Sequence, residues 1–555
     1  PCAEAAAELR CLGGGTAWLG TPRFATAALA GDVSEGTPAL GEALLRPREQ
    51  LVFHTSRTLE DVASGSKDIW IVGKKWQVCA AAAELSQALG QPIIAKQAEA
   101  LTDEYRGCKK EVCCLNGEAI RKVTLLALPE SAGRFVTTVR PDVIAKQLHG
   151  KIADQEVVLA INACDIEAAG FAVARCLPPY TAKTLKKRKA SRCDVSFHGC
   201  TPSVSDSKLL ASAAEGIRVA QGLVDMPPNL LTTTSFKNFV LEAVKDLDGV
   251  TSLVIEGSDL EKNGYGMLWA VGKGARNPPY LIELTHAGGG EGKKAVAIVG
   301  KGIVFDTGGA ALKPRDGMCG MKRDMGGAGG VFGAFLAIAR SGGMPNGQRL
   351  HCVLCVAENA IGSNMFLQDD ILTGYSGLTV EINNTDAEGR LVLGDGVSHV
   401  AKQLECELIL DMATLTGAQG ISTGHNHATI LASNAAAERR VVSAGLASGD
   451  MVHPGIFAPE ILTHEFDSDF ADMRNSVKRR DNAQSSCAGL FIYKHLSHSG
   501  FTASWVHVDM AFPAFAPLGE FSTGWGVGLL CNLLTHWRDD EDNDDDEDDE
   551  SWRMA

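Results

Sequence analysis

Four carboxylate side chains stand near the ends of apolar runs in the second half of the chain. Asp306 ends the run that begins at residue 295, and Asp324 precedes a glycine-rich segment. Asp386 and Glu388 lie two residues apart in a polar stretch. Functional groups gather where the strands of an open α/β sheet end, so we expect these four carboxylates to meet at one site.

Such a site would favour metal chemistry. Four carboxylates at one place repel each other and stay ionised together only when cations compensate them, and two divalent ions that share bridging carboxylates meet that condition. The set contains no histidine, which argues against a His-rich mononuclear zinc site and for oxygen ligands that suit Zn, Mn, Mg or Co. Lys301 would be an unusual ligand, because it would have to be neutral. Any one of these carboxylates alone is more often a helix cap or a surface charge, so the prediction depends on the set.

An alternation of strands and helices would position these residues. Strands are predicted at 295–305, 350–358, 378–382 and 407–412, and helices at 326–340 and 388–403. Shorter β-branched runs alternate with helix-like segments in the first 200 residues as well. The fold class is therefore α/β, with a mixed, largely parallel central sheet flanked by helices in the larger C-terminal domain.

The length of 555 residues predicts two or three domains. A helical period over 207–224 stops at Pro227 and Pro228, which places a junction near residue 205. The predicted parts are a smaller, non-catalytic N-terminal α/β domain with an oligomeric or regulatory role over 1–204, a catalytic domain over 205–537, and an acidic disordered tail over 538–555.

Charge and hydropathy exclude several classes of protein. Eleven carboxylates between residues 539 and 550 account for most of the formal charge of −15, so the rest of the chain is nearly neutral. A neutral chain has no basic surface for nucleic acid, and we expect no nucleic-acid partner. The basic stretch 183–189 is interpreted as a solvated loop. No apolar run is long enough to span a membrane, and no secretory signal is recognisable, so no membrane association is expected.

The sixteen cysteines are scattered, and Cys352 and Cys355 lie in an apolar run that predicts a buried strand. We interpret them as reduced thiols, which indicates a cytoplasmic location. Two further features have structural interpretations. The glycines of Gly326–Gly330 indicate that a helix packs closely beside the site, and the apolar neighbours of His507 indicate that it lies in a strand and is hydrogen-bonded.

The polar stretch Asn384-Thr385-Asp386-Ala387-Glu388-Gly389-Arg390-Leu391 resembles the signature octapeptide of the leucyl aminopeptidase (cytosol aminopeptidase) family. The blocks 300–309, 324–327 and 413–417 resemble that family in the same order, and the resemblance covers about residues 205–535. The sequences of residues 321–324 and 475–489 look similar to those of the family's animal "probable aminopeptidase-like" branch.

The resemblance implies a metalloexopeptidase, a hydrolase that removes N-terminal residues from peptide substrates. Two divalent ions per subunit, Zn²⁺ and/or Mn²⁺ with Mg²⁺ or Co²⁺ as alternatives, would supply a bridging hydroxide that attacks the peptide carbonyl. Lys301, Asp306, Asp324 and Glu388 would bind one ion. Asp306, Asp386 and Glu388 would bind the other. A homohexamer is also implied.

The family's remaining roles carry over to residues beside the metals. Lys313 would stabilise the oxyanion, and Arg390 would hold a bicarbonate that moves the proton. The residues that would position the peptide or line the pocket for its first side chain are Met321, Asn384, Thr414, Leu415 and Gly417. The apolar part of this lining predicts a preference for substrates with Leu- or Met-like N-terminal residues.

Two other functions are compatible with parts of the sequence. A catalytically silent structural or interaction protein could keep this scaffold, although none of the implied catalytic residues is missing. A nucleic-acid-binding regulator could use the basic residues 183–192, but the net charge argues against it.

Overall fold

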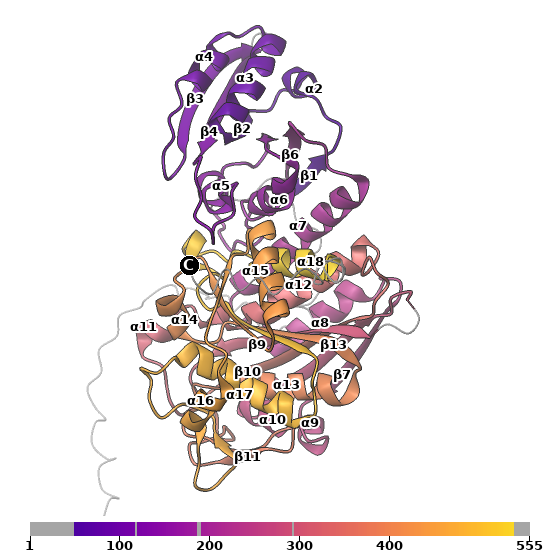
Figure 1. Ribbon diagram of the computed structural model, residues 1–555, viewed down its shortest axis with the longest axis vertical. Coiled ribbons are helices and arrows are strands. Elements are labelled where there is room, and N and C mark those ends of the chain that lie inside the picture. Colours follow the sequence, from indigo (N-terminus) through magenta and orange to yellow (C-terminus); the bar gives the residue numbers. More distant parts are fainter. Residues whose placement is uncertain (1–48, 117–118, 186–189, 291–293, 538–555) are drawn as a thin grey trace, which may run out of the picture.

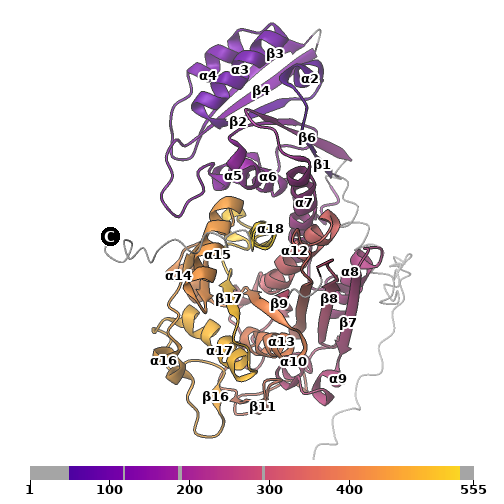
Figure 2. The ribbon, with the colours of Figure 1, turned by 45° about the vertical axis from the view of Figure 1, so that its right-hand side comes forward.

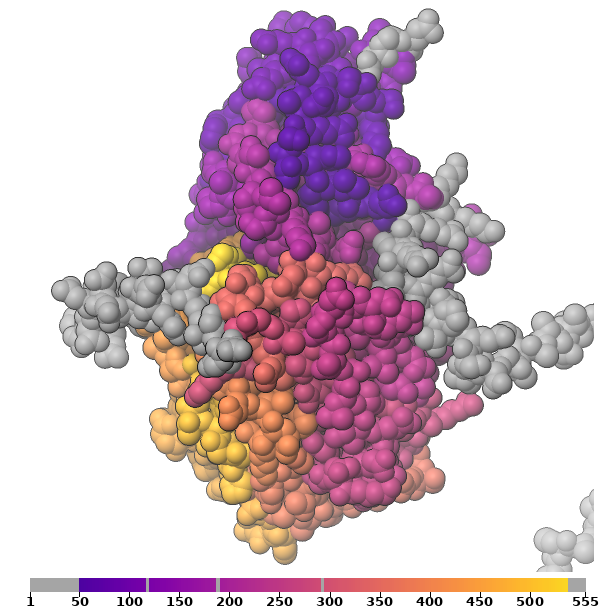
Figure 3. Space-filling model, turned by 90° about the vertical axis from the view of Figure 1, so that its right-hand side faces the viewer, coloured from indigo at the N-terminus to yellow at the C-terminus, as the bar shows by residue number. Residues whose placement is uncertain are grey.

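A computed structural model describes residues 49–116, 119–185, 190–290 and 294–537. It contains two large sheets, one in each half of the chain, and the N-terminal sheet with its helices forms one end of an elongated molecule (Figures 1 and 3). The predicted acidic tail and part of the basic stretch, residues 186–189, lie outside the described residues. No helix within the described ranges is long and apolar enough to cross a membrane.

The N-terminal sheet has six strands in the order β1-β6-β5-β2-β4-β3. All neighbours are parallel except β3 and β4. Its strands are β1 (Glu49–His54), β2 (Ile69–Lys74), β3 (Cys108–Asn116), β4 (Ala119–Leu128), β5 (Glu156–Ala160) and β6 (Ser191–His198).

Alternation along β2 shows how this sheet buries both faces. Ile69 and Ile71 pack with α2 (Leu59–Ser64), α3 (Lys75–Leu89) and α4 (Ile93–Glu99). Trp70 and Val72 face the opposite side, where α5 (Pro141–Leu148) and α6 (Ile166–Ala174) contribute to the main core. Successive side chains of a strand point to opposite faces, so the nearly continuous apolar run predicts a sheet covered on both sides.

The two halves of the chain meet along α7 (Val204–Asp225). Ser203 caps this helix in a reciprocal capping box with Asp206. The helix packs against α12 (Gly326–Ser341) at a point where a Cβ atom on Gly216 would lie 2.3 Å from the Gly333 carbonyl oxygen. The two glycines therefore allow the helix backbones to touch.

The C-terminal sheet has eight strands in the order β15-β14-β17-β13-β9-β10-β8-β7. The centre, β17 to β10, is parallel, and β14, β8 and β7 add antiparallel pairs. Its strands are β7 (Val250–Glu256), β8 (Tyr280–His286), β9 (Ala295–Asp306), β10 (Leu350–Asn359), β13 (Cys406–Ala413), β14 (Ala428–Ala432), β15 (Val452–Pro454) and β17 (Ser504–Asp509). The predicted α/β class with a mixed, largely parallel sheet is confirmed.

Helices cover both faces of this sheet (Figure 2). One face packs against α7, α12, α8 (Thr233–Val244), α15 (Ala435–Ser448) and α18 (Val527–Thr535). The other packs against α10 (Gly266–Gly272), α13 (Gly389–Gln403) and α17 (Gln484–His498). Short elements complete the fold: α9 (Ser258–Lys262), α11 (Arg315–Met318), α14 (Gly417–Ser422), α16 (Pro459–Leu462), and a small sheet of β11 (Ile371–Thr373), β12 (Thr379–Glu381) and β16 (Met473–Arg474).

The structural interpretations of the cysteines and glycines are confirmed. Cys352 and Cys355 are buried free thiols in β10, and the other cysteines of the described ranges are also free. A Cβ atom on Gly327 would lie 2.1 Å from the Met412 carbonyl oxygen of β13. Glycine in the first turn of α12 therefore lets this helix approach the centre of the sheet.

Candidate active site

A cavity of about 460 Å³ opens at the carboxyl ends of the central parallel strands. Neighbouring strands β9 and β13 run parallel, so the residues that follow them meet at the same edge of the sheet. Asp306 is the last residue of β9, and Thr414–Gly417 follow β13. The segment 384–390, which leads into α13, forms another wall.

The structure brings every sequence-predicted site residue to this cavity. The lining includes Lys301, Asp306, Lys313, Met321, Asp324, Asn384, Asp386, Glu388, Arg390, Thr414, Leu415 and Gly417. Four separate segments contribute them, so the cavity exists only after the sheet has formed.

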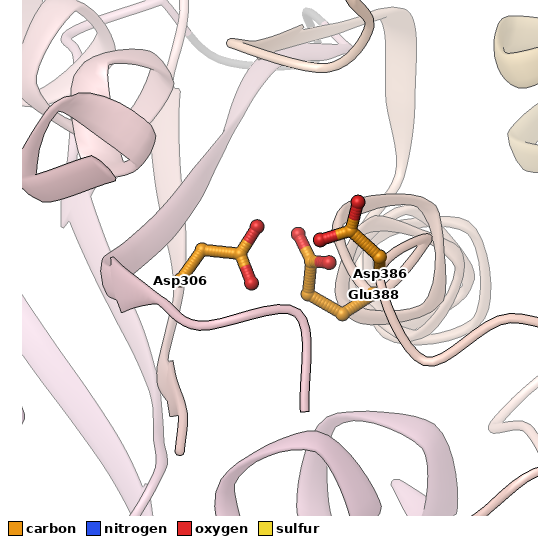
Figure 4. A group of neighbouring side chains, drawn as sticks. All are labelled: Asp306, Asp386 and Glu388. Carbon is orange, nitrogen blue, oxygen red and sulfur yellow. The ribbon is translucent and has the colours of Figure 1, made fainter. Parts of the chain in front are cut away.

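Three carboxylates form the centre of the cavity. Asp306, Asp386 and Glu388 each offer an oxygen, and these oxygens lie within 4.8 Å of one another. Figure 4 shows the three side chains turned towards a common point, with Asp306 approaching from β9 and the other two from the segment that leads into α13. This is a spacing at which one cation can contact all three groups.

Lys301 connects the fourth carboxylate to this centre. Its Nζ atom lies 2.8 Å from Asp324 Oδ2 and 3.0 Å from Glu388 Oε1, and it donates a hydrogen bond to the Thr414 carbonyl oxygen at 3.0 Å. A Cβ atom on Gly389 would lie 2.6 Å from Lys301 Nζ. Glycine at this position of the octapeptide therefore leaves room for the lysine.

Lys313 pairs with the other two carboxylates. Its Nζ atom lies 2.8 Å from Asp306 Oδ2 and 2.5 Å from Asp386 Oδ1. The turn after β9 places it there: Gly308 has a φ of 84° and donates its N–H to Asp306 Oδ1 at 2.8 Å. Such a positive φ favours glycine.

The buried charges of this cluster are poorly balanced without further cations. Burial raises the pKa of Asp306 to about 6 and the pKa of Asp324 well above its usual range, and the charge of Glu388 adds to both effects. Burial alone would also raise the pKa of Glu388, but the charges of Lys301 and Lys313 outweigh it and lower that pKa. The carboxylates in turn raise the pKa of both lysines.

The donor set fits divalent cations. Four carboxylates face two lysines, and Glu388 Oε2 is buried without a hydrogen-bond partner in the described structure. Hard oxygen ligands in this number suit divalent ions, which would compensate the excess negative charge. Lys301 could join them only after losing its proton and its two ion pairs.

Asn359 and Thr414 fix two of the carboxylates from behind. The Asn359 side chain donates to Asp306 Oδ1 at 2.8 Å and to the Thr385 carbonyl oxygen at 3.0 Å. The Thr414 hydroxyl donates to Asp324 Oδ1 at 3.0 Å. Partners of this kind restrict the orientation of metal-binding side chains.

Arg390 is buried beside the cluster. Its Nε and Nη1 atoms have no hydrogen-bond partner among the described residues, and burial lowers its pKa to about 10. An arginine with unused, buried donors is a suitable partner for a small anion.

The segment after β13 is held by Asp509, which sequence reasoning did not assign to the site. Asp509 is fully buried, and its carboxylate accepts hydrogen bonds from the Leu415 N–H, the Thr416 hydroxyl and the Ser485 hydroxyl at 3.2, 2.6 and 3.0 Å. Its position at the end of the apolar strand β17 was the available sequence signal.

Other lining residues were also missed. These residues are Asp316, Gly317, Cys319, Arg323, Ala387, Thr416, Ser476, Arg480, Gln484, Ala511, Phe512 and Phe515. Most lie in irregular segments, where no periodicity marks which side chain faces the site.

His507 lies outside the cavity lining, in β17. Its Nδ1 atom is 2.5 Å from Asp411 Oδ1, and Asp411 Oδ2 also accepts a hydrogen bond from the Trp505 indole at 2.9 Å. The predicted hydrogen-bonded strand histidine is confirmed for Nδ1, whereas Nε2 has no partner in the described part of the chain.

Comparisons with known proteins agree with this site. Residues 218–531 match the catalytic domain of the cytosol aminopeptidase family. The probable aminopeptidase NPEPL1 of Mus musculus is 42% identical over 432 residues, which cover 75% of this chain and 80% of that protein. Leucine aminopeptidase 1 of Caenorhabditis elegans is 38% identical over 419 residues, which cover 74% of this chain and 83% of that protein.

Solved structures show the same fold. Leucyl aminopeptidase from Trypanosoma brucei, in complex with bestatin, superposes with a TM-score of 0.83 at 36% identity, covering 90% of this chain and 98% of that one. The apo leucyl aminopeptidase from Trypanosoma cruzi gives a TM-score of 0.82 at 38% identity, covering 91% and 100%.

Fold, site and similarities together define the class of the protein as a metal-dependent aminopeptidase, a hydrolase. The chain belongs to the cytosol aminopeptidase family. The resemblance inferred from the octapeptide and its flanking blocks is confirmed.

Proposed function

We propose that this chain is a dinuclear metal-dependent aminopeptidase that removes apolar, Leu- or Met-like residues from the N-terminus of peptides. The convergence of Asp306, Asp386 and Glu388 within 4.8 Å carries the proposal. Asp306, Asp324, Glu388 and a deprotonated Lys301 would hold one ion. Asp306, Asp386 and Glu388 would hold the other. Zn²⁺ and Mn²⁺ are the proposed metals, with Mg²⁺ and Co²⁺ as alternatives.

When bound, the two ions would polarise the peptide carbonyl and lower the pKa of a water molecule towards neutrality. The remaining steps depend on the chain itself. Lys313 enters the cavity with a protonated amine, because neighbouring carboxylates raise its pKa, and it is suited to stabilise the negative charge that develops on the carbonyl oxygen. Arg390 keeps its own proton and would hold a bicarbonate, which could take up the proton that the attacking water loses and supply it to the leaving amine.

Substrate selection would depend on the walls of the cavity. The backbone of Leu415 and Gly417 would position the peptide, and Met321, Asn384 and Thr414 would contact its first side chain. The free α-amine of the substrate would also be bound by the metal ions that the carboxylates hold. An internal peptide bond would not react, because the residue before it has no free amine to offer.

The decisive experiment measures leucine release from Leu-amide by the purified, Zn²⁺- or Mn²⁺-loaded chain. We expect activity that a chelator abolishes, that is lost in an Asp324→Ala/Glu388→Ala double variant, and that does not extend to N-acetyl-Leu-amide. Aminocoumarin substrates with Leu, Met, Asp and Lys would test the apolar preference, with Leu and Met expected to react fastest. A metal-loaded wild type that hydrolyses no substrate of this panel would instead identify a catalytically silent scaffold.

Three organisational features complete the proposal. We assign residues 1–204 to a non-catalytic domain, 205–537 to the catalytic domain and 538–555 to an acidic tail, and expression of 205–537 alone tests that division. If the chain forms a homohexamer, sedimentation analysis should give a particle mass of about six times the chain mass of 58.6 kDa. The free cysteines favour a cytoplasmic location, which imaging of the tagged protein in cells would test.

A further inference from the structure

The segment between β16 and α17 forms part of the cavity rim. Ser476 and Arg480 of this segment line the cavity, as does Gln484 at the start of α17, although the segment has little regular structure. It reaches the rim from the side of α17, whereas the carboxylates approach from β9 and α13. It therefore offers contacts to parts of a substrate that lie beyond the carboxylate cluster.

Two buried residues hold this rim segment in place. Asn475 is fully buried, accepts the backbone N–H groups of Asn383 and Asn384 at 3.0 and 3.2 Å, and donates to the Asn384 carbonyl oxygen at 2.6 Å. The start of the segment is therefore tied to the signature octapeptide.

Glu465 holds the other part of the segment, on both sides of residue 480. Its carboxylate, 2% exposed, accepts hydrogen bonds from Arg479 Nη2 at 3.1 Å and from Asn482 Nδ2 at 2.7 Å. Its backbone carbonyl accepts the Lys478 N–H at 3.1 Å. Arg479 is thereby directed to Glu465, whereas Arg480 faces the cavity.

Arg480 differs from the other cations of the cavity. Lys301 and Lys313 are paired with carboxylates, and Arg323 pairs with Glu520 at 2.9 Å and lies over the Phe515 ring. Arg390 also has unpaired donors, but it is buried beside the carboxylates. The Arg480 side chain is exposed, and within the described ranges no hydrogen bond or ion pair engages it. Its guanidinium is available to a ligand at the cavity mouth.

We propose that Arg480 binds a carboxylate on the leaving-group side of the peptide substrate and so selects short or acidic peptides. This inference rests on the proposed function, which places the free α-amine at the carboxylate cluster. A short peptide bound in that direction presents its α-carboxylate towards the mouth, where a planar guanidinium can bind both carboxylate oxygens. An acidic side chain at the second substrate residue offers the same chemistry.

The test compares substrates that differ only in one negative charge. The metal-loaded full-length chain is assayed for kcat/KM on Leu-Gly and Leu-Gly-amide, which differ in the α-carboxylate, and on Leu-Asp-amide and Leu-Asn-amide, which differ in the side chain. Each acid-to-neutral ratio is measured in the wild type, Arg480→Gln, Arg480→Lys and Lys478→Gln. Lys478 is an exposed cation of the same segment that does not line the cavity, so Lys478→Gln is the matched control for a loss of charge.

We expect Arg480→Gln to lower one acid-to-neutral ratio about three- to tenfold, the range between an exposed ion pair and a bidentate charge-assisted contact. Arg480→Lys should restore part of the ratio, and Lys478→Gln should leave it unchanged. The substrate pair that responds identifies the source of the carboxylate.

Unchanged ratios for both pairs in Arg480→Gln would overturn the inference, and so would an equal loss in Lys478→Gln. Either result would leave the proposed function intact, because hydrolysis of the neutral substrates would continue. A wild type that hydrolyses none of the four substrates would overturn both.

Discussion

Two clusters of charged side chains, one at each sheet, show how the balance of charge separates a stabilising network from a reactive one. The N-terminal cluster comprises His54, Arg57, Lys67, Glu156, Arg192 and Asp194. The catalytic cluster comprises Lys301, Asp306, Lys313, Asp324, Asp386 and Glu388. Each contains six ionisable groups, but the N-terminal cluster has two carboxylates and the catalytic cluster has four.

The N-terminal cluster is well satisfied by its own bases. Asp194 accepts hydrogen bonds from His54 and Lys67 at 2.7 Å and from Arg192 at 2.9 Å. Burial alone would raise the pKa of Asp194, but these contacts outweigh it and lower that pKa strongly. Arg57 pairs with Glu156 at 3.0 Å and partly offsets the effect of burial, which raises the pKa of this carboxyl. This cluster has no need of an added cation.

The catalytic cluster has the opposite balance. Its two lysines do not offset four carboxylates, three of them buried, and the pKa of Asp306 and of Asp324 is raised. The difference teaches that an excess of buried carboxylates over bases, and not the presence of buried charge as such, marks the site that calls for metal ions.

The largest effect should come from Glu388→Gln, which removes a carboxylate assigned to both metals. We expect kcat/KM for Leu-amide to fall by about 10³-fold or more, because several kcal/mol of transition-state stabilisation depend on the ions. Asp194→Asn is the matched control and should keep wild-type activity. Comparable losses in the two variants would remove the distinction between the clusters.

The next effect concerns Lys313, whose amine faces the reacting carbonyl in the proposed function. Lys313→Gln should lower kcat about 10²- to 10³-fold, the usual cost of removing one oxyanion-stabilising donor. Metal content, measured by mass spectrometry of the purified variant, should stay at the wild-type level. Loss of metal together with activity would show that the lysine acts in metal binding instead.

Metal addition should stabilise the catalytic half alone. At a free ion concentration 100 times the dissociation constant, binding contributes about 2.7 kcal/mol, so the thermal transition of the metal-depleted chain should move upward with Zn²⁺ or Mn²⁺. Asp194→Asn should show the same shift, whereas Glu388→Gln should lose most of it. If the thermal transition of Glu388→Gln rose as much as that of the wild type, the ions would have to bind at another site.

The smallest effect is on stability. Asp194→Asn should lower the free energy of unfolding by about 1–3 kcal/mol at pH 7, because three bases lose a charged acceptor. The pKa of Asp194 is lowered on folding, so its contribution is present above the unfolded pKa of about 4 and is lost as the pH falls through the folded value. Denaturation at pH 7 and pH 3 should therefore show a smaller difference between variant and wild type at the lower pH.

Local sequence determined most of the regular structure near the site. The predicted strand 295–305 and helix 326–340 correspond to β9 and α12, which begin or end within a residue of the prediction. Long apolar runs that are bounded by glycine or charged residues specify their own structure, because burial and turn formation are decided within a few residues. The antiparallel strands β7 and β8 were not predicted; β7 is the edge strand and is largely exposed, so its sequence has no continuous apolar run.

For the site, the sequence by itself determined which residues are present and that their carboxylates exceed the cations available to balance them. The octapeptide brought Asp386 and Glu388 together, because they are two residues apart. Tertiary structure alone decided that Lys301 lies between Asp324 and Glu388, that Asp509 holds the segment after β13, and that Arg480 faces the cavity while Arg479 does not. These contacts join residues about 20 to 95 positions apart or depend on an irregular backbone, and their geometry is fixed only when the parallel strands align in register and the helices pack on them.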